Sequence, residues 1–278
     1  MRKSLTLLFV LTLLYSTIQA QGLKTPAPST TTTVKQEFAL SSIELSYSRP
    51  SMKGRTIFGD LVPYGKVWRT GANGATTLTF GEVVSIGGTK IPAGKYGLLT
   101  MPGQSEWTII ITKQLDVTSP AAYKQDQDVV RLTAASTDIP FSLENFTIMF
   151  GNITANTCEI WIIWDKTMVT VPISVDVDKK VMAQIDDAMK NDSRPYFNAA
   201  MYYMDNNKDL NKALEWFNKA ADQNPEAFWV LHQKAKCLGK LGKKADAVAT
   251  AKKSIELAQK AKNDDYVKLN EDLIKSLK

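Results

Sequence analysis

The chain has 278 residues, and its 34 Lys and Arg against 28 Asp and Glu give a formal net charge of +6. Part of this small excess is carried by Arg2 and Lys3 at the N-terminus, so the charge gives no argument for a nucleic-acid partner. The single histidine, His232, excludes a multi-histidine metal site, and we expect neither a metal nor a cofactor.

Residues 1–20 have the pattern of a secretory signal peptide. A basic MRK is followed by the apolar run LTLLFVLTLLYSTI and by a small residue, Ala20, at a cleavage position. The apolar run is shorter than the ~20 residues that a bilayer span needs, and no later segment is long and apolar enough to replace it. We therefore predict cleavage after Ala20, a periplasmic or extracellular protein, and no membrane span.

Residues 21–35, QGLKTPAPSTTTTVK, are polar, contain proline and repeat threonine. Such a segment buries too little apolar surface to offset the entropy lost on ordering. The pattern predicts a disordered linker before the first domain.

Residues 36–176 are predicted to form an all-β domain. Short β-branched and aromatic runs, such as TTLTFGEVVSI and YGLLTM, are separated there by Gly, Pro and Asn. A region of this length and pattern is typical of a single β-sandwich or jelly-roll-like domain. In CEIWIIW, residues 158–164, both alternating faces are apolar, which indicates a central strand covered on both sides.

Two turns can be predicted within this domain. Gly87-Gly88 suits a two-residue hairpin loop, because glycine tolerates positive φ at both positions. Pro92-Ala93-Gly94 predicts a second turn. Tyr96 directly after it predicts a tyrosine corner, in which the hydroxyl bonds the nearby backbone.

A basic block, YSRPSMKGRTIFGDLVPYGKVWRTGAN, holds Arg49, Lys53, Arg55, Lys66 and Arg69 within 21 positions. Together with IPAGKYGLLTMPGQSEWTIIITK, the block resembles the secreted bacterial family of domain of unknown function 2911, over about residues 36–176. The motifs YSRP, KGR, IFG, VPYG, VWRTGAN and PAGKY, in that order, carry the resemblance. It implies a β-sandwich and export, but no established activity.

Two interpretations of the basic block stay open. In the structural one, Asn73-Gly74 forms a two-residue hairpin and Arg69 pairs with a carboxylate such as Asp60. In the functional one, donors converge into a pocket for a small anion or a sugar, because arginine forks favour bidentate recognition of oxyanions. The residues of this candidate binding site are Arg49, Arg55, Arg69 and Asn73.

A rival hypothesis is an envelope enzyme, such as a carbohydrate-active hydrolase. Glycoside hydrolysis needs two carboxyl groups roughly 5 to 10 Å apart across a cleft. The family resemblance implies an acidic residue after GAN, where this chain has Gly74, so general acid–base catalysis loses one candidate. The remaining candidate acids are Asp60, Glu82, Glu106, Asp126 and Asp128.

Residues 177–278 are predicted to be all-α. Apolar residues recur there at helical spacing, beginning with Val181, Ile185 and Ala188 or Met189. The last stretch, residues 264–277, has the apolar face of a capping helix.

This helical region also repeats. Ala213, Phe217, Ala220 and Pro225 have the spacing of the second helix of a tetratricopeptide repeat, and Ala247, Ala251 and Ser254 follow 34 residues later. The resemblance covers two units, about 194–227 and 228–261. It is weaker in the second, where Ala and Gln replace the preferred aromatic and proline.

The repeat resemblance implies stacked antiparallel helix pairs with a concave groove for a peptide or protein partner. The repeat's spacing implies that the groove is lined by Asn198, Tyr202, Asp205, Trp229, His232 and Lys236. The alternative is a purely structural bundle that braces the β-domain. In that case Trp229 seals the interface between the units.

The two cysteines, Cys158 and Cys237, fall in different predicted domains, and neither has the CxxC or Cys/His spacing of a zinc or redox site. Export permits a disulfide between them, but cysteine behaves as a small hydrophobe in cores, which favours two buried free thiols.

Together these patterns predict an exported, non-enzymatic binding or scaffold protein. Its β-sandwich would bind a ligand or an envelope component, and its helical repeats would hold a protein partner.

Overall fold

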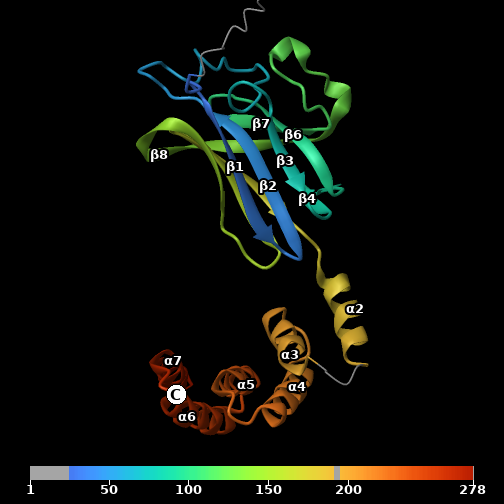
Figure 1. The fold of residues 1–278 in the computed structure, drawn as a ribbon, viewed down its shortest axis with the longest axis vertical. Coiled ribbons are helices and arrows are strands. Elements are labelled where there is room, and N and C mark those ends of the chain that lie inside the picture. Colours follow the sequence, from blue (N-terminus) through green and yellow to red (C-terminus); the bar gives the residue numbers. More distant parts are fainter. Residues whose placement is uncertain (1–24, 191–194, 278) are drawn as a thin grey trace, which may run out of the picture. The chain divides into compact units, whose positions relative to one another are not determined.

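The computed structural model describes residues 25–190 and 195–277. They divide into two compact units, one ending at Asp176 and the other beginning at Val177 (Figure 1). The predicted signal peptide, residues 1–20, lies outside the described residues. In the described ranges, no helix has the length and apolar character of a membrane-spanning segment.

The first unit is all-β. Its strands are β1 (Thr30–Phe38), β2 (Ser41–Arg49), β3 (Thr76–Phe80), β4 (Val84–Ile86), β5 (Thr89–Ile91), β6 (Gly94–Met101), β7 (Glu106–Thr112), β8 (Asp128–Gly151) and β9 (Thr157–Ser174). They form an antiparallel sheet in the order β1-β2-β3-β6-β7-β8-β9-β4-β5. Residues 128–135 of β8 pair with β7, and residues 136–151 pair with β9. The strands therefore form one hydrogen-bonded sheet, whose two parts share β8.

The two parts of the sheet meet through buried and half-buried aromatic side chains. The Tyr47 hydroxyl on β2 donates to the carbonyl of Ile148 on β8 at 3.0 Å and accepts from its N–H at 2.9 Å. Around this contact lies an aromatic cluster with ring centroids 4.8 to 6.4 Å apart. Its members are Tyr47, Phe58, Trp68, Trp107, Phe146 and Trp164.

Strand β1 corrects the predicted linker, because residues 30–35 are paired and not disordered. The register runs from Thr30 opposite Arg49 to Phe38 opposite Ser41. Threonine is β-branched and favours extended backbone, and the ladder hydrogen bonds to β2 offset the ordering entropy that the polar composition could not. Composition alone misled the prediction because it carries no information on strand pairing.

The two predicted turns are confirmed. Gly87 and Gly88, with φ of 56° and 78°, connect β4 to β5. The Tyr96 hydroxyl donates to the Pro92 carbonyl at 3.0 Å, which closes the tyrosine corner. Strand β9, which contains the CEIWIIW run, lies between β8 and β4 as expected of a central strand.

The second unit is all-α in its described residues. Its helices are α2 (Asp178–Ala188), α3 (Tyr196–Asp205), α4 (Leu210–Gln223), α5 (Phe228–Lys240), α6 (Lys244–Lys260) and α7 (Asp264–Ser276). The pairs α3/α4 and α5/α6 occupy the two predicted repeats, and α7 is in the place of the capping helix. The prediction of an all-β domain followed by a helical repeat domain is confirmed.

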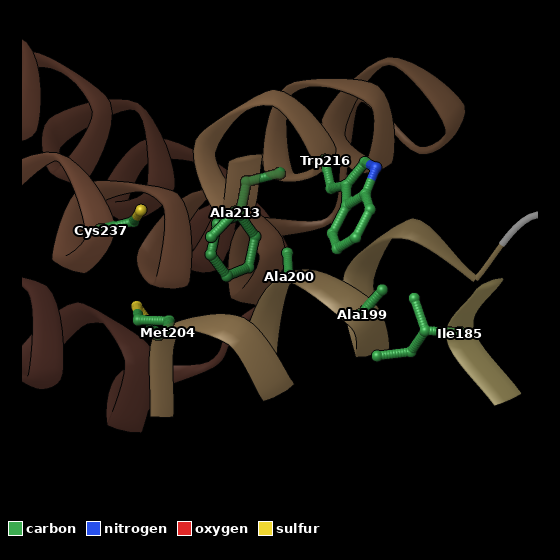
Figure 2. Packing of buried hydrophobic residues seen from close by; sticks show 8 residues of the cluster. Ile185, Ala199, Ala200, Met204, Ala213, Trp216 and Cys237 are labelled. Atoms are coloured by element: carbon green, nitrogen blue, oxygen red, sulfur yellow. The ribbon is translucent and has the colours of Figure 1, made fainter. Parts of the chain in front are cut away.

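A compact core holds the first repeat together. Figure 2 shows Ile185 of α2 beside Ala199 of α3, with Trp216 of α4 above them. Phe217 of α4 and Cys237 of α5 belong to the same buried cluster. In both repeats, small residues let the backbones of neighbouring helices approach each other. Ala213 of α4 and Ala247 and Ala251 of α6 are each fully buried.

Both cysteines are free and buried, as favoured by the sequence. Burial, with the nearby Glu159 charge, raises the pKa of the Cys158 thiol to about 11. Burial also raises the pKa of Cys237. At neutral pH both are therefore protonated packing residues and poor nucleophiles.

Candidate functional site

The basic block forms the long connection between β2 and β3, residues 50–75, called here the β2–β3 loop. Trp68 exchanges backbone hydrogen bonds of 2.7 and 3.0 Å with Thr100 of β6. At the start of the loop, the Pro50 carbonyl accepts from Phe146 N–H of β8 at 2.9 Å. These contacts anchor the loop to both parts of the sheet.

A pocket of about 340 Å³, called here the basic pocket, lies against this loop. Its lining contains three basic side chains and two tryptophans but no carboxylate. A smaller pocket of about 190 Å³ shares Leu61, Val62, Trp68 and Arg69 with it. The basic pocket is lined by Pro28, Ser29, Pro50, Ser51, Lys53, Arg55, Leu61, Val62, Trp68, Arg69, Gly71, Ala72 and Trp164.

Two of the predicted site residues, Arg55 and Arg69, line this pocket. Arg55 is exposed and donates from Nε to the Met52 carbonyl at 2.9 Å and from Nη2 to the Ser51 carbonyl at 2.6 Å. Arg69 donates from Nη1 to the Thr118 carbonyl at 2.8 Å, and its buried Nε has no hydrogen-bond partner among the residues that the structure describes.

Arg49 and Asn73 are outside the lining, which corrects the predicted convergence of four residues. Arg49 donates from Nε to the Phe146 carbonyl at 3.1 Å and from Nη2 to Thr147 Oγ1 at 2.9 Å. It therefore links β2 to β8 and acts structurally. Asn73 donates from Nδ2 to the Ser29 carbonyl at 3.2 Å, and so holds the chain that enters β1.

The structural interpretation of the block is also wrong in two details. Asn73 has a φ of 62°, but Gly74 has no positive φ and β3 begins only at Thr76, so the pair does not form a two-residue hairpin. Arg69 bonds a backbone carbonyl and does not pair with Asp60, which is exposed.

The sequence did not mark the tryptophans or the N-terminal segment as parts of the site. Trp68 lies inside the VWRTGAN motif and Trp164 ends the CEIWIIW run, but nothing in either pattern shows that the two meet. Pro28 and Ser29 belong to the segment predicted as a linker. Their place in the pocket wall follows from the pairing of β1, which no local pattern shows.

The candidate acids are scattered. Glu82 accepts from the Leu40 N–H at 3.1 Å, and Asp128 bonds Tyr123 and Arg131. The other three are exposed, and none of the five lines the basic pocket or its neighbour. The described residues contain no cluster of acids, His and Cys that could hold a metal ion. The hydrolase hypothesis therefore receives no support from this geometry. The three exposed acids are Asp60, Glu106 and Asp126.

In the first repeat, Tyr202 is held by α2. Its hydroxyl donates to Asp178 Oδ1 at 2.9 Å, and Lys208 Nζ lies 2.7 Å from the same oxygen. Hydrogen bonds from Lys208 and then Tyr202 lower the pKa of Asp178. Asn198 and Asp205 are exposed.

In the second repeat, Trp229 is 39% exposed, and its ring packs edge-on against Phe228 with centroids 5.1 Å apart. Lys236 is half-buried. Trp229 is therefore a large aromatic surface open to solvent on α5. That these residues line a groove stays a prediction.

His232 corrects the predicted groove, because it is only 6% exposed. Its Nδ1 donates to Asn270 Oδ1 on α7 at 3.0 Å, and its ring packs edge-on against Tyr266. Helix α7 covers the position that the repeat spacing assigns to the groove. The sequence of α7 predicted a capping helix but not which side chains it covers.

The pKa of His232 is lowered, first by burial and further by the Lys236 charge, although the hydrogen bond that His232 donates to Asn270 opposes this shift. The folded state therefore binds a proton less readily than the unfolded state, whose histidine pKa is about 6.5. The stabilisation from neutral His232 is present above that value and is lost as pH falls through the folded pKa.

We therefore expect the free energy of unfolding of the repeat unit to fall between pH 7.5 and pH 5.5. His232→Asn keeps an amide donor at the Nδ1 position but cannot titrate, and it should flatten this dependence. His232 is the only histidine in the chain, so the difference between the two proteins isolates it. Urea unfolding at several pH values measures the effect, and equal slopes for both proteins would contradict it.

Two family models match the chain. The family described as protein of unknown function (DUF2911) matches residues 29–173, and a tetratricopeptide repeat model matches residues 193–226 and 230–260. No curated protein and no solved structure gives a match. The repeat model agrees with the predicted units to within a few residues and suggests protein–protein interaction. Because the first match covers slightly more than half of the 278 residues, the chain belongs to the DUF2911 family, and its second unit carries tetratricopeptide repeats.

Proposed function

We propose that this protein is an exported, non-enzymatic binding protein. Its sheet unit holds a small anionic or sugar ligand in the basic pocket, and its repeat unit holds a protein partner. The observation that carries the ligand part is the lining of the pocket, where three basic side chains meet two tryptophans and no carboxylate. Export is supported by the signal-like pattern of residues 1–20.

The basic pocket carries the positive charge of three side chains. Lys53, Arg55 and Arg69 form no ion pair with any residue that the structure describes. A concave site with one sign of charge concentrates ligands of the opposite sign. Its volume of about 340 Å³ suits a small molecule.

A comparison of two sugars tests the ligand part. Glucuronate carries a carboxylate on the same ring that glucose carries without charge. We expect glucuronate to bind and to raise the melting temperature of the sheet unit, and glucose to bind less tightly, because only the acid can use the cationic groups. If neither sugar nor any other small anion binds, the ligand part of the proposal fails.

For the repeat unit, Trp229→Ala should abolish capture of the partner from an envelope fraction while changing the melting temperature by less than about 3 °C. An exposed ring contributes little to folding but can supply a large rigid anchor for binding. Phe141→Ala, at a residue 56% exposed in the sheet unit, is the matched control and should leave capture intact. A loss of several kcal/mol of stability with capture unchanged would show that Trp229 only seals the repeat.

A further inference from the structure

The ladder of β8 and β9 has one face in the core and one face open to solvent. Side chains alternate between the two faces, and Ile148, Phe150 and Ile160 are buried on the inner one. Met149 lies opposite Trp161 in the register and is 42% exposed, so the outer face is open at this point. Trp161 is half-buried and belongs to the same outer face.

The indole of Trp161 lies flat on the backbone of β8. A Cβ added at Gly151 would lie 2.4, 2.5 and 2.9 Å from Cε2, Cζ2 and Cδ2 of the ring. Cδ2 and Cε2 form the bond that the two rings of the indole share. A point so close to both of these atoms and to Cζ2 lies over the ring face and not at the ring edge. One face of the indole is therefore covered by Gly151, and the other points away from the sheet.

Two polar side chains hold the edge of this ring. Trp161 Nε1 donates to Glu159 Oε2 at 2.7 Å, and Asn152 Nδ2 donates to the same oxygen at 2.8 Å. Both bonds use Oε2, so Oε1 of Glu159 takes part in neither. The indole is thus fixed in place, and little side-chain entropy would be lost when a ligand stacks on it.

A pocket of about 490 Å³, called here the hydroxyl pocket, begins at this polar pair, because the same asparagine and glutamate line it. Ser85 of β4 and Ser174 of β9 line it as a directly opposed pair. Within the described part of the chain, neither serine hydroxyl forms a hydrogen bond. Thr154 and Thr157 also line the pocket, and their hydroxyls bond each other at 2.6 Å. No lysine or arginine is among its described lining residues.

These surroundings suit an uncharged sugar better than an ion. A serine hydroxyl can both donate and accept a hydrogen bond, as each hydroxyl of a sugar can. A pyranose ring with equatorial hydroxyls presents C–H groups on its faces, and such an apolar surface packs well on a flat aromatic ring. The one carboxylate and the lack of basic side chains disfavour an anion, in contrast to the basic pocket.

We propose that this face of the sheet unit binds an uncharged oligosaccharide. One pyranose ring stacks on Trp161, and the neighbouring ring enters the hydroxyl pocket. Glu159 and Asn152 connect the two places and supply an acceptor and a donor between them. The hydroxyl pocket shares no lining residue with the basic pocket, and the proposal does not rest on the function of that pocket.

Isothermal titration of the full mature chain tests the proposal with three neutral trisaccharides, which are cellotriose, maltotriose and chitotriose. We expect at least one of them to bind about tenfold or more tightly than glucose, because one ring cannot occupy both places. Tetramethylammonium is the competing probe, since a carboxylate beside an aromatic ring also suits a cation. The proposal fails if no trisaccharide binds more tightly than glucose, or if tetramethylammonium binds more tightly than every trisaccharide.

Variants locate the contact. Trp161→Ala removes the stacking surface and should weaken binding of that trisaccharide by about tenfold or more, whereas Trp161→Phe keeps a flat ring and should lose less than about threefold. Two controls should leave binding within about twofold. Phe141→Ala removes another exposed aromatic side chain of β8, and Arg55→Ala alters the basic pocket. Circular dichroism checks that the variants are folded.

The variants also show how the proposal can be wrong. If Trp161→Ala leaves binding unchanged, or if Arg55→Ala weakens it equally, the sugar binds elsewhere and the proposal fails. Equal losses in Trp161→Ala and Trp161→Phe would contradict stacking, because they would trace the effect to the bond with Glu159. If Trp161→Ala does not fold, Trp161→Met decides, since it keeps a large apolar side chain without a flat ring and should show the same loss. Binding of glucuronate should be unchanged in these variants of Trp161, so failure here leaves the proposed function of the basic pocket intact.

Discussion

Replacing Asn270 with alanine should lower the free energy of unfolding of the repeat unit by about 3 kcal/mol. Asn270 is 0% exposed. Its Nδ2 donates to Ser254 Oγ of α6 at 2.9 Å and to the Tyr266 carbonyl at 2.7 Å. Its Oδ1 accepts from His232 Nδ1 of α5 at 3.0 Å. One side chain thus joins three helices, and alanine leaves the His232 donor unsatisfied in the core.

Asn263→Ala is the matched control, because it removes the same side chain from the same helix. Asn263 caps the N-terminus of α7 and accepts from the Tyr266 N–H at 3.1 Å. Loss of an N-cap costs about 1 kcal/mol. Urea unfolding followed by hydrogen exchange of α7 measures both variants. Equal losses in the two variants would mean that the buried network adds nothing beyond the cap.

The fold of the helical unit was predictable because its sequence pattern is local and repeats along the chain. Small residues such as Ala213 and Ala247 recur at a spacing of 34 residues, and that spacing determines which helix faces meet. The burial of His232 was not predictable in this way. It depends on α7, whose own sequence does not match the repeat, so the repeat spacing assigned His232 to an open groove that α7 covers.

In the sheet unit, the turns were predictable and the pairings were not. Gly87-Gly88 and Tyr96 act through neighbours within a few residues, and such local chemistry can be read from sequence. The pairing of β1 with β2 depends on the hydrogen bonds of another strand. From sequence alone, the polar threonine run is predicted to be disordered, because its pairing with β2 cannot be seen.

The basic block shows the same limit for function. Arg49, Arg55 and Arg69 are equivalent in the sequence, and the arginine-rich composition predicted one anion site for all three, which stays a prediction. What distinguishes them is where the acceptors of the protein lie around each guanidinium. Arg49 and Arg55 each use Nε and Nη2 for bonds within the protein, whereas the bond of Arg69 runs from Nη1, and no sequence pattern carries that difference.

Trp164→Ala should have the largest effect on the sheet unit, lowering its free energy of unfolding by about 3–5 kcal/mol. Trp164 is 1% exposed, and its Nε1 donates to the Glu144 carbonyl at 3.2 Å. Its ring contacts Phe58, Trp68 and Phe146 with centroids 5.6 to 6.4 Å apart. Alanine would leave a cavity where the two parts of the sheet meet and would remove a wall of the basic pocket.

Trp161→Ala tests whether this loss comes from the aromatic cluster or from the strand itself. Trp161 lies on the same strand but is half-buried, and its Nε1 donates to Glu159 Oε2 at 2.7 Å. We expect it to cost about 1 kcal/mol, because less apolar area leaves contact with protein. Urea unfolding with hydrogen exchange, which reports the two units separately, measures both variants. The cluster explains the stability of the sheet unit only if Trp164→Ala costs clearly more, because both variants remove the same side chain from β9.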